Sequence, residues 1–137
     1  MKIYTNELEK KNQIKFKNSK ILIKSLTHKS HDLTNNNEKL EFLGDRVLGL
    51  VISKKLLEIY PNETEGILDK KLASLVNKKK CLEVAKSLGL EKFILVGNSK
   101  KKKVKVQDKI ISDCCEALIG ALYIDQGFYA VEKFILK

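Results

Sequence analysis

The stretch of sequence that decides the fold reads Glu38-Lys39-Leu40-Glu41-Phe42-Leu43-Gly44-Asp45-Arg46-Val47-Leu48-Gly49. Apolar residues recur through it and beyond with helical spacing, which predicts a long helix from about 38 to 59 that Tyr60-Pro61-Asn62 ends. We expect this helix to be buried on most sides. Glu38, Glu41 and Asp45 nevertheless share one of its faces, because they stand at positions i, i+3 and i+7. An unpaired carboxylate among apolar neighbours is energetically unfavourable, so we expect a cation to neutralise the charge on this face.

A second apolar segment, expected to be a helix over about 108–125, carries acids in the same manner. Asp113 and Glu116 stand three residues apart within it. Small residues on the two segments would let the helices approach closely: Gly44, Gly49, Ala117, Gly120 and Ala121. A hard divalent cation between the helices would accept carboxylate oxygens, and Mg²⁺ suits such a site best. The alternative is pairing of the acids with neighbouring basic residues, for which Lys39, Arg46 and Lys109 are placed.

The remaining sequence also favours an all-α fold. One Pro and seven Gly interrupt it, and no strand-like alternation of any length occurs. Further helices are expected over about 19–26, 65–78, 81–88 and 129–136, with Ser19 and Thr64 as caps and with Gly89 and Gly127 as ends. A polar loop is expected over 31–37, and a second loop follows Gly97.

Composition limits the class of protein. The chain has 137 residues, of which 43% are hydrophobic, enough for one packed domain. It contains no apolar run long enough to span a membrane and no visible secretory signal. Cys81, Cys114 and Cys115 form neither a disulfide framework nor a CxxC zinc spacing, which fits a reducing cytoplasm. A formal charge of +10, from 27 Lys and Arg against 17 Asp and Glu, favours polyanion partners, although compositional bias is an alternative.

The run from Asn37 to Asp45 closely resembles the signature stretch of the ribonuclease III family. Four further stretches resemble that family in the same order, so that the resemblance covers about 14–136. They are Leu26-Thr27-His28-Lys29-Ser30, Glu65-Gly66 followed by Leu72-Ala73-Ser74-Leu75-Val76, Gly97 before a variable basic loop, and Asp113-Cys114-Cys115-Glu116-Ala117-Leu118-Ile119-Gly120-Ala121.

The resemblance implies the all-α helical fold of the ribonuclease III endonuclease domain, as a dimer. It implies a metal site of four carboxylates, namely Glu41, Asp45, Asp113 and Glu116. Of these, Asp45 and Glu116 would be catalytic and Glu116 the most critical ligand. The implied cofactor is Mg²⁺, for which Mn²⁺ would substitute, with one or two ions in each active site.

Other positions receive weaker roles from the same resemblance. Glu38 and Glu65 correspond to acids at the rim of the site, for a second metal position or for substrate contacts. Phe42 corresponds to an aromatic that inserts into a pocket of the partner subunit, unless it belongs to the core. His28 is interpreted as structural. The run Lys100, Lys101, Lys102 and Lys103 would either contact RNA phosphates or remain solvated.

The implied function is hydrolysis of double-stranded RNA to products with 5′-phosphate and 3′-hydroxyl ends and short 3′ overhangs. A homodimer would supply one active site for each strand of the duplex. The implied biological role is RNA processing. Neither a membrane partner nor a small-molecule cofactor is expected. The alternatives are a relative that binds duplex RNA without cutting it and a purely structural α-helical dimer. Residues 1–137 are expected to be one catalytic domain. The double-stranded-RNA-binding domain usual in bacterial-type members is not expected in this chain, which is either a piece of a longer protein or a natural short form.

Overall fold

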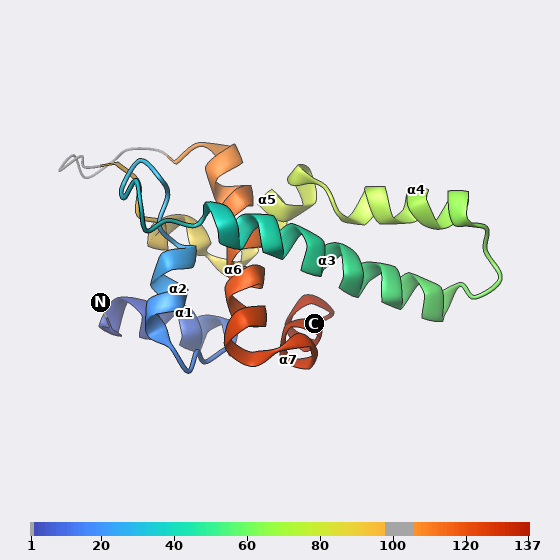
Figure 1. Ribbon diagram of the computed structural model, residues 1–137, viewed down its shortest axis with the longest axis horizontal. Helices are drawn as coiled ribbons and strands as arrows, with labels where there is room; N and C mark the ends of the chain where they lie inside the picture. Colours follow the sequence, from blue (N-terminus) through green and yellow to red (C-terminus); the bar gives the residue numbers. More distant parts are fainter. Residues whose placement is uncertain (1, 98–105) are drawn as a thin grey trace.

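The computed structural model describes residues 2–97 and 106–137, and these form a helical domain (Figure 1). The helices are α1 (Lys2–Asn12), α2 (Ser19–Ser25), α3 (Glu38–Ile59), α4 (Glu65–Leu75), α5 (Lys78–Leu88), the 3₁₀ helix η1 (Leu90–Phe93), α6 (Asp108–Gln126) and α7 (Phe128–Ile135). Within the described ranges no strand occurs, only an isolated bridge between Thr27 and Leu95. The predicted all-α fold is confirmed.

Helix α6 is the centre of the domain, and α2, α3, α5 and α7 pack around it. Nearly every residue from Ile111 to Leu122 is buried, since neighbours cover this helix on most sides. Gly44 of α3 and Gly120 of α6 lie where the two helices cross. A Cβ at Gly44 would overlap the carbonyl oxygen of Glu116, and one at Gly120 would overlap that of Leu40. The backbones of the two helices are therefore in direct contact at Gly44 and Gly120, as predicted from these small residues in the sequence. Gly49 takes no part in the contact.

Helices α3 and α4 form a hairpin that projects away from the rest of the domain (Figure 1). No residue of α4 is buried. On α3, Phe42, Leu50 and Leu57 are 62%, 58% and 60% exposed. The expectation that this helix is buried on most sides is therefore wrong for the isolated chain, because α6 covers only one face of it.

Capping side chains set several of the helix boundaries. Helix α3 begins and ends at the predicted residues, and the Thr64 hydroxyl accepts a hydrogen bond from the Ile67 N–H as the predicted cap. The helix expected over 65–78 ends at Leu75, and the helix expected over 81–88 begins three residues earlier, at Lys78, because the Asn77 side chain caps α5 by accepting from the Lys80 N–H. Asn18, rather than Ser19, caps α2. Helix α1 was not predicted from the sequence.

The three cysteines are buried and free, as expected for small apolar side chains in a core. None of the helices in the described ranges is long and apolar enough to cross a membrane.

Candidate metal centre

Three carboxylates from two helices meet beside the crossing of α3 and α6. Glu41 comes from α3, and Asp113 and Glu116 come from α6; one oxygen from each lies within 4.8 Å of the others. The Glu116 side chain is only 3% exposed, whereas those of Asp113 and Glu41 are 15% and 31% exposed. The glycine contact fixes this geometry, because Glu41 follows Leu40 and Glu116 itself supplies the carbonyl against Gly44.

Two lysines contact the acids. The Nζ atom of Lys78, the first residue of α5, lies 2.6 Å from Asp113 Oδ1, 2.6 Å from Glu116 Oε1 and 3.4 Å from Glu41 Oε2. Lys109 Nζ lies 2.8 Å from the other Asp113 oxygen, Oδ2. The pairing of Lys109 with Asp113 is the alternative that the sequence left open, and it exists together with the cluster.

Burial raises the pKa values of Glu41 and Glu116, whereas hydrogen bonds from the two lysines lower that of Asp113. Burial, together with the neighbouring Asp45, raises the pKa of Glu116 to about 7. Burial and the charge of Asp113 raise the pKa of Glu41. Burial raises the pKa of Asp113 too, but its hydrogen bonds from Lys109 and Lys78 outweigh this and leave it lowered. The cluster thus holds more negative charge than its environment stabilises, even with two lysines present.

These donors fit a divalent metal ion. Carboxylate oxygens are the preferred ligands of hard cations such as Mg²⁺ and Mn²⁺, which bind through few carboxylates and keep several waters. The half-exposed Glu41 leaves one side of the cluster accessible to solvent.

Asp45 lies next to the cluster without joining the three closest oxygens. It contributes to the raised pKa of Glu116, while its own Oδ2 lies 3.6 Å from Arg46 Nη1. The structure therefore brings three of the four predicted carboxylates together and places the fourth beside them.

The weaker candidates lie elsewhere. Glu38 is exposed and lies 3.8 Å from Lys29 Nζ, outside the cluster. Glu65 is exposed at the start of α4, at the tip of the projecting hairpin, so one chain does not bring it to the acids (Figure 1). The run from Lys100 to Lys103 lies outside the described residues.

His28 Nδ1 and Ser30 Oγ are joined by a hydrogen bond 2.7 Å long. Ser30 Oγ also accepts from the Gly97 N–H at 2.9 Å, and the Ser30 N–H donates to His28 Nδ1 at 3.1 Å. These bonds close a tight turn and join it to Gly97. They support the structural interpretation of His28.

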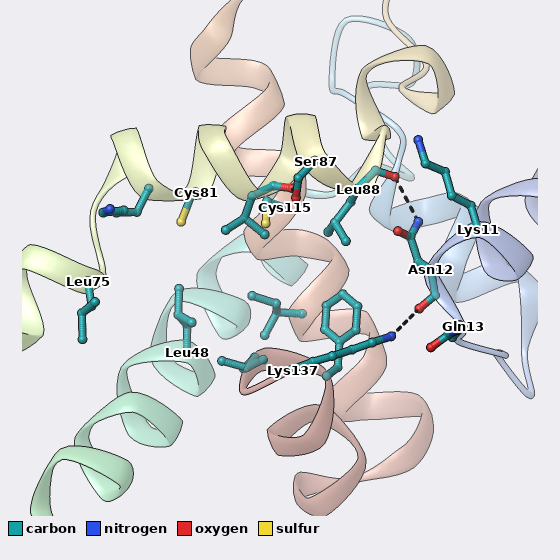
Figure 2. Close-up of a pocket in the computed structure, with 15 residues that line it drawn as sticks. Lys11, Asn12, Gln13, Leu48, Leu75, Cys81, Ser87, Leu88, Cys115 and Lys137 are labelled. Carbon is teal, nitrogen blue, oxygen red and sulfur yellow. Dashed lines mark hydrogen bonds between the residues drawn. The ribbon is translucent and has the colours of Figure 1, made fainter. Parts of the chain in front are cut away.

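A cleft with a volume of 540 Å³ lies on a different side of α6 (Figure 2). Apolar side chains such as Leu48, Leu75 and Leu88 line it together with Cys81 and Cys115, and no carboxylate does. At its rim, Asn12 Nδ2 donates to the Leu88 carbonyl and Lys137 Nζ donates to the Asn12 carbonyl. The cleft offers mainly apolar contact, and none of the clustered carboxylates lines it.

Comparison with known proteins identifies the family and agrees with the fold. A family model described as ribonuclease-III-like matches residues 18–137. The chain belongs to the ribonuclease-III-like family. "Ribonuclease 3" of Pelagibacter ubique is 66% identical over 137 residues, which are 100% of this chain and 62% of that relative. The ribonuclease-III-like chain thus spans less than two thirds of this curated relative.

Solved ribonuclease III structures share the fold. The nuclease domain of ribonuclease III from Campylobacter jejuni, described for structural flexibility in a region involved in dimer formation, aligns with a TM-score of 0.88 and 41% identity. That alignment covers 94% of this chain and 91% of the other. Dicer from Pichia stipitis aligns with a TM-score of 0.70 and 25% identity over 90% of this chain and 54% of its own.

Proposed function

We propose that the chain is the catalytic domain of an endoribonuclease that hydrolyses double-stranded RNA with a divalent metal ion, Mg²⁺ or in its place Mn²⁺. The observation that carries the proposal is the meeting of Glu41, Asp113 and Glu116 oxygens within 4.8 Å on two helices in contact. Membership of the ribonuclease-III-like family supports it. The resemblance in sequence implies a metal-binding role for the same acids.

The positions of the four carboxylates suggest different roles in metal binding. Glu41, Asp113 and Glu116 would hold the ion, and Asp45 would bind either the same ion or a second one. A divalent ion supplies an activated water and stabilises charge on the scissile phosphate. Glu116 is the most buried of the acids, so its orientation is fixed by packing and it is the most critical ligand. Glu41 borders solvent and faces the side from which RNA would approach.

Duplex RNA is the substrate class that the charge of the chain favours. A net charge of +10 suits a polyanion, and A-form RNA is recognised by its shape, 2′-hydroxyls and phosphates rather than by base sequence. We propose products with 5′-phosphate and 3′-hydroxyl ends and short 3′ overhangs. The non-cleaving binder is the second candidate, and the intact acidic cluster disfavours it.

The surface of α3 and α4 supports a homodimer. Phe42 is 62% exposed under the Arg46 guanidinium, whose central carbon lies 3.9 Å from the ring centroid. Leu50, Leu57, Ile67 and Leu75 are also exposed on these two helices, and a second copy related by a two-fold axis would cover such apolar side chains. Sedimentation velocity tests this proposal, and a monomer at every protein concentration would contradict it.

We further propose a role in RNA processing, on a ribosomal precursor, a messenger or a small structured RNA, in the cytoplasm. The support for this compartment is chemical, since all three cysteines are free thiols buried in the core.

The preference for duplex RNA is testable directly. In Mg²⁺ the chain should cleave a long perfect duplex at least about ten times faster than either of its strands alone, because only the duplex presents paired A-form backbones. The measurement is the appearance of shortened products on a denaturing gel, with single strands designed to lack internal pairing as the control. Equal rates on both substrates would contradict the proposed substrate class.

A further inference from the structure

Lys78 places a positive charge inside the acidic cluster. Its Nζ lies 2.6 Å from oxygens of both Asp113 and Glu116 and 3.4 Å from Glu41. These are the three residues that would hold the metal ion, and Lys78 reaches them from α5, a third helix. The other cation in contact with the cluster, Lys109, touches only the outer oxygen of Asp113.

The ammonium and a metal ion cannot occupy the cluster together. A bound Mg²⁺ lies about 2.1 Å from each ligand oxygen. An ion that shared Asp113 Oδ1 and Glu116 Oε1 would therefore take the position that Lys78 Nζ fills, and the two positive charges would repel each other. Lys109 meets no such conflict, since its bond goes to Asp113 Oδ2.

Lys78 is also able to leave. Its side chain is 56% exposed, and it stands at the first position of α5, where one side of the residue faces solvent. A lysine stem is flexible and can move its ammonium to water without any movement of the helix. The bonds that it breaks on leaving are replaced by those from the carboxylates to the ion.

We propose that Lys78 is an internal cation that holds the metal-free cluster together and competes with the divalent ion for it. This inference rests on the proposed metal-dependent function. It explains how two apolar helices keep three carboxylates within 4.8 Å before the ion arrives. The same contact weakens metal binding. If the ammonium fills the cluster for about 90% of the time, the apparent affinity of the chain for the divalent ion falls about tenfold.

The test compares Lys78→Met with Lys109→Met, because both remove one positive charge that bonds to Asp113. The measurement is the dissociation constant of Mg²⁺ by calorimetric titration of the whole chain without RNA. Lys78→Met should bind Mg²⁺ about ten times more tightly than the parent chain. The dissociation constant of Lys109→Met should differ from that of the parent chain by only about twofold, because the exposed Lys109 ammonium bonds to Asp113 Oδ2 alone and does not fill the space between the acids.

Thermal melting gives a second readout. Without metal, Lys78→Met should melt at a lower temperature than Lys109→Met, and saturating Mg²⁺ should raise its melting temperature by more than that of the parent chain. If the Met variant does not fold without metal, Lys78→Gln retains a donor for the cluster and serves in the same comparison.

The outcomes separate this inference from the proposed function. Mg²⁺ binding by the parent chain with an unchanged dissociation constant in Lys78→Met would overturn the role of Lys78 alone. Equal tightening in both variants would overturn it too, since net charge would then explain the effect. Failure of the parent chain and of both variants to bind Mg²⁺ or Mn²⁺ would overturn the metal-dependent function as well.

Discussion

Replacement of Glu116 by Gln is expected to slow cleavage of duplex RNA by a factor of about 10³ or more, which corresponds to roughly 4 kcal/mol of transition-state stabilisation. Gln has the shape of Glu but offers a neutral amide, which is a poor ligand for a hard cation. Glu116 is the most buried acid of the cluster, so packing fixes its orientation. The measurement is the single-turnover rate on duplex RNA in saturating Mg²⁺.

The fold should survive this change. Burial already raises the pKa of Glu116 to about 7, so a neutral side chain at this position is tolerated. Lys78 would keep its bonds to Asp113 and Glu41. The matched control is Glu58→Gln, which alters an exposed acid on the distal part of α3 and should cleave at the parent rate. Cleavage by Glu116→Gln at that same rate would show that Glu116 is not a ligand.

Replacement of Gly44 by Ala is expected to destabilise the chain by about 3 kcal/mol, which would lower the melting temperature by about 10 °C. The added methyl group would overlap the carbonyl oxygen of Glu116 and approach the Gly120 N–H to 3.0 Å. Both are backbone atoms that cannot move aside like a flexible side chain. Helices α3 and α6 would have to separate, and the three carboxylates would separate with them. Urea unfolding measures the loss of stability.

Gly49 offers the matched control on the same helix. A Cβ at Gly49 meets no atom within 4 Å, so Gly49→Ala should be neutral or should stabilise the helix by up to about 1 kcal/mol. Equal stability of Gly44→Ala and the parent chain would mean that the helices are not in backbone contact at this crossing.

The part of the fold that the sequence predicted rests on local chemistry. Pro61 with its neighbours ends α3, Thr64 caps α4, and Gly89 and Gly127 adopt the positive φ angles that end α5 and α6. The acids were visible because carboxylates are unusual on apolar helices. Small residues on both apolar helices indicated a close approach, which occurs at Gly44 and Gly120 but not at Gly49.

The part that was missed depends on tertiary packing. Residues 78–80 are three consecutive lysines, and their spacing in the sequence does not indicate which of them contacts the acids. From the sequence, Lys78 was placed at the end of the helix expected over 65–78, whereas it is the first residue of α5, which packs against α6. The exposure of Leu50 and Leu57 was missed because an apolar side chain looks the same in a core and in a subunit interface.

The central claim is that the carboxylates of α3 and α6 form the metal site of a nuclease for double-stranded RNA. The most direct test is incubation of long duplex RNA with the chain in excess chelator and then in added Mg²⁺ or Mn²⁺, with analysis of product sizes and ends. We expect no cleavage in chelator, and full recovery with either ion to short products with 5′-phosphate and 3′-hydroxyl ends. Cleavage that continues in chelator, or a duplex left intact in both ions, would contradict the claim.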